Sequence, residues 1–270
     1  MPELPEVETV KESLKLKLLG QKIEDTNIMY PKIIEYPVVS EWMEKIKGQV
    51  IRNISRRGKW LLFELDDYVL LSHLRMEGRY YFRDKKDPYE KHEHVVFHFE
   101  DFDLRYVDTR KFGRMHLIEK EQLYNRKPLN ELGLEPFDEN LTNQYLKQQY
   151  QKKSLPIKTV LLDQKIIVGI GNIYADEILY LSKINPLKKV SVLSKRELDK
   201  IIENTKLVLK EAIEKGGTTI KSYESSEGVH GRFQHQLLVH GKKNCPHCKK
   251  EIKKITVGGR GTYYCPTCQK

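Results

Sequence analysis

The sequence predicts a multidomain α+β protein: an antiparallel β-sandwich or barrel with one helix in front, then a mostly helical segment, then a short β-hairpin that carries four cysteines. Three observations support this prediction. Short apolar runs separated by polar turns fill residues 51–118, helix-type periodicity dominates the second half of the chain, and all four cysteines fall within the last 26 residues. Such runs are typical of antiparallel strands, whereas apolar residues at three- and four-residue steps are typical of helices.

Length and composition are those of a globular protein of about two domains. The 270 residues are 39% hydrophobic and 32% charged, and the mean hydropathy is -0.60. A membrane span needs a run of about 18 apolar residues, and the sequence contains none. Since the first residues also lack the apolar run of a signal peptide, we expect the protein to stay in the cytoplasm.

A helix is predicted near the N-terminus, followed by strands. Apolar residues recur at helical spacing from Val7 to Leu18, with Pro5 in the expected first turn and Gly20 beyond the end. The turns after residue 65 contain Asp, Gly and Pro, which favours hairpins between the following strands. The six predicted strands lie at residues 60–65, 68–72, 79–82, 94–99, 104–107 and 115–118.

The second half is predicted to be helical. Residues 127–136, rich in Pro, Asn and Gly, interrupt the periodicity and indicate an interdomain linker. Ser194 and Glu197 form a capping-box signature ahead of an apolar stripe that ends at Gly216. Residues 169–172, Gly-Ile-Gly-Asn, lack the preceding strand and the third glycine of a dinucleotide-binding motif, so we interpret them as a tight loop.

Cysteine spacing predicts a structural zinc site. Cys245 and Cys248 form one Cys-x2-Cys pair, and Cys265 and Cys268 form a second pair after a further 16 residues. Two such pairs across a β-hairpin can supply four thiolates to a tetrahedral Zn2+ and leave no open position for catalysis. A redox or disulfide pair is the competing interpretation, which a cytosolic chain disfavours. We expect His247, inside the first pair, to lie on the surface rather than to bind the metal.

Positive charge is concentrated in the second half of the chain. Residues 1–140 contain 24 Lys and Arg against 27 Asp and Glu, a balance of -3, whereas residues 141–270 contain 24 against 11, a balance of +13. A surface of this kind attracts polyanions, of which nucleic acid is the commonest. A solvated Lys-rich surface without a partner is the alternative that charge alone leaves open.

Pro2 and Glu3 form a candidate catalytic pair. If Met1 is removed, Pro2 carries a free secondary amine, and an ordinary α-amino group with a pKa of about 8 is partly neutral at pH 7. Such an amine can attack an aldehyde-level carbon to form an iminium, and Glu3 can exchange the protons required. The alternative is a proline and acids that only begin a helix. Considered alone, Lys59 is expected to be exposed to solvent. Arg260 lies in a glycine-rich turn, where an arginine suits a phosphate ligand.

Three motifs resemble those of formamidopyrimidine-DNA glycosylases. They are Met-Pro-Glu-Leu-Pro-Glu-Val-Glu-Thr-Val at residues 1–10, Gly-Ile-Gly-Asn-Ile-Tyr-Ala-Asp-Glu at 169–177, and Gly-Gly-Arg-Gly-Thr at 258–262 together with the double Cys-x2-Cys ending. Shorter matches fall in the expected order between them, including His-Leu-Arg-Met-Glu-Gly at 73–78 and Asp-Thr-Arg-Lys-Phe-Gly at 108–113. The resemblance therefore runs from the first residue to the last.

The resemblance implies an N-terminal β-sandwich domain at residues 1–130, a helix-two-turn-helix domain at 131–235 and a zinc finger at 236–270. It implies a bifunctional enzyme of base excision repair, which removes oxidised purines such as 8-oxoguanine and formamidopyrimidines and cleaves the strand by β,δ-elimination as an AP lyase. The expected partner is double-stranded DNA with oxidised purines or abasic sites. One structural Zn2+ is the expected cofactor, and a monomer in the bacterial cytoplasm is the expected form.

Four catalytic roles are implied by the resemblance. Pro2 is expected to attack C1′ of the damaged nucleoside, and Glu3 to act as the acid that opens the sugar ring. Lys59 is expected to donate a proton for β-elimination, and Arg260 for δ-elimination. Because an arginine stays protonated, phosphate clamping is the more natural role for Arg260.

The resemblance also implies contacts to DNA. Met76, Arg110 and Phe112 match residues that fill the gap left by an extruded base, since Met and Phe can wedge into the stack and Arg can bond the orphaned base, preferably cytosine. Residues 218–232 are expected to form a mobile lid over the flipped base. The residues expected to bind the DNA backbone are His92, Arg110, Lys152 and Asn172, with Lys158 and His73 as further candidates.

The sequence departs from the family pattern at two places and leaves two alternative functions open. Arg75 stands where glycine is expected most often, and Tyr263-Tyr264 stands near the usual Thr-Phe-Tyr. Leu4 favours the purine enzymes over the related endonuclease VIII proteins, which more often begin Pro-Glu-Gly-Pro-Glu. The alternative functions are a glycosylase for oxidised pyrimidines and a non-catalytic zinc-ribbon DNA-binding protein.

Overall fold

The computed structural model describes residues 2–151, 153–218 and 232–270. They form two compact units, each with its own hydrophobic core. The first unit holds Pro2 and Glu6–Asn130, and the second holds Glu3–Pro5, Glu131–Thr218 and Arg232–Lys270. The division between residues 130 and 131 lies inside the segment expected to be a linker.

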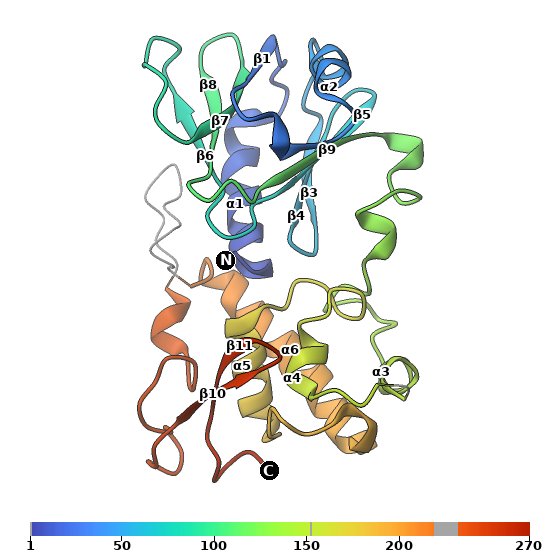
Figure 1. Ribbon diagram of the computed structural model, residues 1–270, viewed down its shortest axis with the longest axis vertical. Helices are drawn as coiled ribbons and strands as arrows, with labels where there is room; N and C mark the ends of the chain where they lie inside the picture. The colour runs from blue at the N-terminus through green and yellow to red at the C-terminus, as the bar shows by residue number, and fades with distance from the viewer. Residues whose placement is uncertain (1, 152, 219–231) are drawn as a thin grey trace. The chain divides into compact units, whose positions relative to one another are not determined.

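Two β-sheets form the first unit (Figure 1). One has the strand order β1-β7-β8-β6 and the other the order β2-β9-β5-β4-β3. All neighbouring strands are antiparallel except β2 and β9, which are parallel. The strands are β1 (Asp25–Ile28), β2 (Ile34–Tyr36), β3 (Asn53–Arg57), β4 (Trp60–Glu64), β5 (Tyr68–His73), β6 (Arg79–Arg83), β7 (Glu93–His98), β8 (Asp103–Val107) and β9 (Arg114–Glu119).

Both sheets share one core with two helices. The helix α1 (Leu4–Leu18) contributes the apolar residues that its periodicity predicted, and α2 (Val39–Ile46) contributes Trp42 and Ile46. Trp42 lies against Phe97 of β7, with ring centroids 5.9 Å apart. Removing this apolar surface from water is the main favourable contribution to the stability of such a core.

Helices build most of the second unit. The longest, α6 (Lys195–Glu214), begins with the predicted capping box: the Ser194 hydroxyl accepts the N–H of Glu197, and the Glu197 carboxylate accepts the N–H of Ser194. It packs with α5 in a core of buried apolar residues. The other helices of this unit are α3 (Asn143–Tyr150), α4 (Ile157–Leu161), α5 (Asn172–Ser182) and the 3-10 segments η4 (Val190–Val192) and η5 (Phe233–Gln236). The 3-10 segment η3 (Leu129–Glu131) contains the division between residues 130 and 131.

A β-hairpin with the four cysteines completes the second unit. Its strands β10 (Lys253–Val257) and β11 (Arg260–Tyr264) pair antiparallel around Gly258 and Gly259, which both have left-handed backbone with φ of 55° and 75°. Glycine adopts this conformation at little steric cost, so the tight turn is possible.

The structure confirms the predicted fold class, with a two-sheet N-terminal part, a helical part and a cysteine hairpin. The six predicted strands are present with ends shifted by no more than a residue. The sequence interpretation missed β1, β2, β3 and the short helices α2 and α3. Helices of eight residues have little stability of their own, and packing of residues such as Trp42 stabilises them. Two further 3-10 segments are η1 (Pro31–Ile33) and η2 (Lys120–Gln122).

Among the described residues, no helix has both the length and the apolar character that crossing a bilayer requires.

Candidate functional site

The Glu3 carboxylate accepts three hydrogen bonds at the N-terminus of α5. The backbone N–H groups of Gly171, Ile173 and Tyr174 donate to it at 2.7, 2.9 and 3.3 Å. The N–H groups of a first helical turn have no partner within the helix and carry partial positive charge, so a carboxylate suits this position. Glu3 is only 2% exposed. The helix therefore holds an acidic group directly after Pro2.

Two glycines make room for residues 3 and 4. A Cβ at Gly171 would lie 2.3 Å from Cδ of Glu3, and a Cβ at Gly169 would lie 2.4 Å from Cδ1 of Leu4. The N–H of Leu4 also donates to the Gly169 carbonyl at 3.0 Å. Residues 169–171 form a loop, as predicted, whereas Asn172 begins α5, and the two glycines allow the start of the chain to lie against this loop.

The cysteine hairpin is attached to the same end of α5. The Asn172 side chain donates to the carbonyl of Gly261 at 2.8 Å. At the turn, a Cβ on Gly258 would lie only 2.6 Å from Oγ1 of Thr159 in α4, so hairpin and helix are in close contact. Arg260, beside Gly261, is exposed. The structure thus brings Glu3, Asn172 and the turn that carries Arg260 to one end of α5.

A buried network joins the hairpin segment to α4 and α5. Asp176 accepts hydrogen bonds from Lys158 Nζ at 2.5 Å and from a backbone N–H of β11 at 3.1 Å, and it lies 2.6 Å from Nδ1 of His240. Its neighbour Glu177 accepts the N–H groups of residues 238–240 at 2.7–3.0 Å. Burial raises the pKa of Glu177, and these N–H groups oppose that effect.

Lys158 does not have the role expected from the sequence. Its side chain is fully buried, and Nζ donates to Asp176 and to the carbonyl of Asn172. Burial lowers the pKa of Lys158, whereas the Asp176 carboxylate raises it. Since the ammonium group is held inside the protein, the expected contact between Lys158 and the DNA backbone is wrong.

Lys59 is buried although a lone lysine in such a turn was expected to be exposed. It lies with Gly58 in the two-residue turn between β3 and β4, and it is 6% exposed. Gly58 has a left-handed φ of 56°, which fits the tight hairpin.

His73 lies next to this hairpin in the sheet. Its partner across β4 and β5 is Trp60, with ring centroids 4.8 Å apart. Burial, with the positive charges of Arg75 and Lys59, holds the pKa of His73 well below its ordinary value. Because Nδ1 accepts the N–H of Arg75 at 2.9 Å, the neutral ring carries its hydrogen on Nε2. His73 is therefore a neutral donor near pH 7, and not a cation.

Tyr106 supports two loops that bear candidate DNA contacts. Met76 lies in the turn 75–77, and a Cβ on the following Gly78 would lie 2.2 Å from the Tyr106 hydroxyl. Phe112 lies in the second loop, and a Cβ on the following Gly113 would lie 1.8 Å from the same hydroxyl. Both glycines are thus required by the tyrosine ring between them.

Asp108 organises the second loop, residues 108–113. Its carboxylate accepts the N–H groups of Arg110, Phe112 and Gly113 at 2.8–3.0 Å. The Arg110 guanidinium lies 4.7 Å from the centre of the Phe112 ring. Phe112 is 44% exposed, so its ring is available for contact with a partner.

His92 is joined to this loop through the backbone. The N–H of Asp108 donates to the His92 carbonyl at 3.1 Å, and the Asp108 carbonyl lies 2.8 Å from Nε2 of His94. His92 has a left-handed φ of 76°, an unusual conformation for a residue other than glycine. The structure therefore brings His92, Arg110 and Phe112 into one loop cluster, with Met76 connected to it through Tyr106.

Pro2, Lys152 and the expected lid are the remaining candidates from the sequence. Pro2 is buried and lies in irregular backbone just before α1. Lys152 and residues 219–231 of the expected lid lie outside the described residues.

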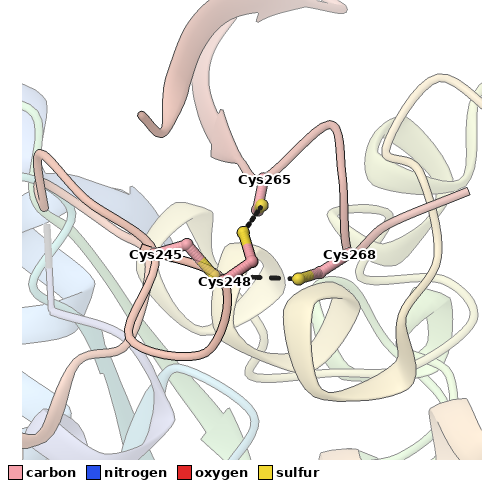
Figure 2. A group of neighbouring side chains, drawn as sticks. All are labelled: Cys245, Cys248, Cys265 and Cys268. Carbon is pink, nitrogen blue, oxygen red and sulfur yellow. Dashed lines mark hydrogen bonds between the residues drawn. The ribbon is translucent and has the colours of Figure 1, made fainter. Parts of the chain in front are cut away.

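The four cysteine sulfurs fit one zinc ion. All lie within 4.8 Å of one another, with Sγ separations of 3.8 Å for Cys245 and Cys268 and 3.5 Å for Cys248 and Cys265 (Figure 2). Zn–S bonds of about 2.3 Å in a tetrahedron place sulfurs about 3.8 Å apart. Burial and the neighbouring sulfurs raise the pKa of Cys268 to about 12, so a cation is needed for all four to be thiolates.

Sequence reasoning missed three residues that shape the site: Tyr106, Asp108 and Asp176. Asp108 carried a local signal, because an aspartate commonly accepts N–H groups two or more residues later. Tyr106 carried none, and Asp176 stood in the motif at 169–177 without a sign of its role, since the partners of both residues are distant in the chain.

Three family models match the chain. They are the formamidopyrimidine-DNA glycosylase N-terminal domain at residues 1–115, the formamidopyrimidine-DNA glycosylase H2TH domain at 132–224, and a zinc finger found in FPG and IleRS at 242–270. Together the matched segments cover most of the sequence.

Relatives and solved structures match over the full length. The chain is 51% identical to the formamidopyrimidine-DNA glycosylase of Shouchella clausii and 49% identical to that of Oceanobacillus iheyensis, covering 100% of this chain and 99% and 98% of theirs. A Lactococcus lactis FPG mutant in complex with Fapy-dG DNA superposes with a TM-score of 0.94 at 40% identity, with both chains fully covered. The same protein with abasic-site DNA gives 0.93 at 39% identity, covering 99% of each chain.

Replacing Gly171 with alanine is expected to disrupt the contact between Glu3 and α5. The new Cβ would overlap the Glu3 side chain, so the free energy of unfolding should fall by about 1–3 kcal/mol. Gly261→Ala is the matched control, because its Cβ would meet nothing closer than 3.6 Å. Thermal unfolding of both variants provides the measurement. Equal melting temperatures for Gly171→Ala and the wild type would contradict the packing described here.

Cys248→Ser is expected to lose zinc and the fold of the hairpin together, because three sulfurs hold the ion much less tightly. Zinc content by atomic absorption and affinity for duplex DNA are the measurements. His247→Ala is the matched control and should keep one zinc per chain, since the histidine is exposed and lies outside the four-cysteine cluster. Full zinc content in Cys248→Ser, or loss of zinc in His247→Ala, would rule out this ligand set.

Proposed function

Since this chain belongs to the formamidopyrimidine-DNA glycosylase family, we propose that it removes oxidised purines from double-stranded DNA and then cleaves the strand at the abasic site. The observation that carries the proposal is the Glu3 carboxylate, held by three N–H groups of α5 beside Pro2 in the chain. Pro2 directly precedes Glu3 in the chain, so its amine lies within one residue of this anchored acid. A nucleophilic amine needs such a group to move protons.

The reaction begins at the Pro2 nitrogen after removal of Met1. The nitrogen lone pair forms a bond to C1′ while the bond between C1′ and the damaged base breaks. The base leaves with that electron pair and takes a proton from water, and the Pro2 nitrogen gives its N–H proton to Glu3. Opening of the sugar ring transfers the C1′–O4′ electron pair to O4′, which takes a proton, and a C1′ iminium remains. Loss of a C2′ proton expels the 3′ phosphate, and a second elimination expels the 5′ phosphate.

Glu3 is proposed to supply the proton to O4′. Both of its oxygens accept N–H groups in the structure. The carboxylate can stabilise the positive charge that develops at C1′ and the Pro2 nitrogen. Proton donation then requires that Glu3 first take a proton, for which the Pro2 amine is the nearest source along the chain.

Lys59 and Arg260 are proposed to act on the phosphates and the leaving groups. Burial of Lys59 in a rigid turn supports a role as a positioned proton donor in β-elimination. Arg260 is exposed at a turn that α4 and α5 hold in place, which supports clamping of a phosphate during δ-elimination.

Met76, Arg110 and Phe112 are proposed to fill the gap left by the extruded nucleotide. Exposure of Phe112 and its support by Asp108 favour an apolar wedge on a rigid loop. The guanidinium of Arg110 can bond the edge of the unpaired base. His92, Lys152 and Asn172 are proposed to contact phosphates, and the excess positive charge of residues 141–270 supports strong binding to a polyanion.

The bacterial relatives support action in the bacterial cytoplasm, where chromosomal DNA is found. We propose that the three segments 1–130, 131–235 and 236–270 are the domains of the enzyme. One zinc ion held by the four cysteines would stabilise the hairpin and take no part in the chemistry.

Removal of oxidised pyrimidines is the second candidate function. A Lactococcus lactis FPG complex with DNA that contains an oxidised pyrimidine superposes with a TM-score of 0.92 at 39% identity, with both chains fully covered. We expect the purine activity to be the stronger, with 8-oxoguanine opposite cytosine cleaved faster than thymine glycol. Single-turnover cleavage of the two duplexes measures the ratio. A faster reaction on thymine glycol would replace the purine assignment with the pyrimidine one.

The proposed chemistry predicts that borohydride traps wild-type protein on a duplex with 8-oxoguanine, whereas Pro2→Gly gives much less crosslink, because a flexible primary amine replaces the secondary amine of the proline ring. Glu3→Gln should bind the same duplex and fail to release the base. Glu12→Gln is the matched control, because Glu12 is an exposed acid on α1, and it should retain full activity. Mass spectrometry of the wild-type N-terminus checks that Met1 has been removed.

Two outcomes would contradict this mechanism. One is strand cleavage at the wild-type rate by protein whose N-terminus keeps Met1. The other is normal base release by Glu3→Gln. Binding without any crosslink in the wild type would instead support a non-catalytic DNA-binding protein.

A further inference from the structure

We propose that Arg75 makes a contact to the DNA phosphate backbone beside Met76, in addition to the contacts expected from the family pattern. This inference rests on the proposed function, because it assumes that Met76 enters the DNA. Arg75 stands at a position where the family pattern most often has glycine.

The backbone of Arg75 explains the expectation of glycine. Its φ is 54°, in the left-handed region that glycine adopts freely and that a residue with a Cβ adopts at a cost. The turn is tight, since the N–H of Gly78 donates to the Leu74 carbonyl at 2.9 Å and the N–H of Arg75 donates to Nδ1 of His73 at 2.9 Å. A glycine here would relieve strain, so the arginine side chain requires another reason.

The side chain of Arg75 is exposed and has no salt bridge within the described part of the chain. The nearby carboxylate of Glu35 pairs with Arg114 instead. Partial burial and the Arg114 guanidinium both lower the pKa of Arg75, although the group stays charged at neutral pH. Arg75 and Arg114 therefore face the same carboxylate, and Arg75 forms no salt bridge among the described residues, although Glu77 lies in the same turn.

No other side chain of the turn 75–77 carries a positive charge. His73 is neutral near pH 7 for the reasons given above, and Met76 is apolar. Arg75 is thus the cationic group of the turn that carries the proposed wedge. A phosphate is the favoured ligand, because an exposed guanidinium binds its oxygens in a bidentate manner and phosphates flank every base step that a wedge can enter.

The test measures how the affinity for a duplex with a tetrahydrofuran abasic analogue depends on salt. Each lost phosphate contact reduces the slope of log Kd against log salt concentration by about 0.9. We expect this reduction in Arg75→Gly, with up to about eightfold weaker binding at 0.1 M salt. Arg75→Lys keeps the charge and should retain most of the wild-type slope. Lys22→Ala is the matched control, because it removes an exposed cation of the same unit that pairs with Glu24, and its slope should be unchanged.

Stability separates this contact from a structural role. Arg75→Gly should melt at the wild-type temperature or above it, because glycine suits the left-handed backbone, while its binding is weaker. An unchanged slope and affinity in Arg75→Gly would overturn the proposal, as would an equal loss of slope in Lys22→Ala, which would indicate net charge alone. A changed preference for the opposite base with an unchanged slope would assign Arg75 to a base and also overturn the phosphate contact.

Wild-type controls distinguish failure of this inference from failure of the proposed function. If wild-type protein is trapped by borohydride and Arg75→Gly binds as wild type does, only the Arg75 contact is rejected. If the wild type binds lesion duplex no better than undamaged duplex and forms no crosslink, the proposed function is rejected, and with it the premise that Met76 enters the DNA.

Discussion

The hydrogen bonds from the first turn of α5 to the Glu3 carboxylate are the constraint on which the candidate site depends. They join the start of the chain to a helix 168 residues later. The same helical turn carries Asn172, which bonds the hairpin of Arg260. One helix end therefore positions an acid and a guanidinium-bearing turn, and it can do so because Gly171 leaves no side chain between Glu3 and the helix.

In the first unit too, a carboxylate that accepts backbone N–H groups holds a candidate loop in place. The exposed Phe112 ring gains little stabilisation from burial, and Lys111 beside it has left-handed backbone. Arg75 and His92, in other loops of this unit, also have left-handed backbone. Asp108 compensates with three hydrogen bonds to the loop backbone. Strained and exposed residues that a rigid framework holds in place are common at binding sites, where the ligand supplies the missing contacts.

Local patterns predicted much of the fold. The periodicity of α1 and the capping box of α6 depend on residues within one or two helical turns, and the strands β4 to β9 follow apolar runs bounded by turn residues. By contrast, α2 has eight residues and is stabilised by Trp42 in a core shared with both sheets. No local pattern reports a packing partner elsewhere in the chain, so such elements are missed.

The sequence by itself determined the chemistry available to the protein: a proline beside an acid at the start, four thiols at zinc spacing at the end, and an excess of positive charge in the second half. These properties follow from residue types and short spacings. Only the tertiary structure decided which groups are free to act. It buries Lys158 against Asp176 and leaves Arg75 exposed, because the exposure and the charge partners of a side chain depend on segments that folding brings together from distant parts of the chain.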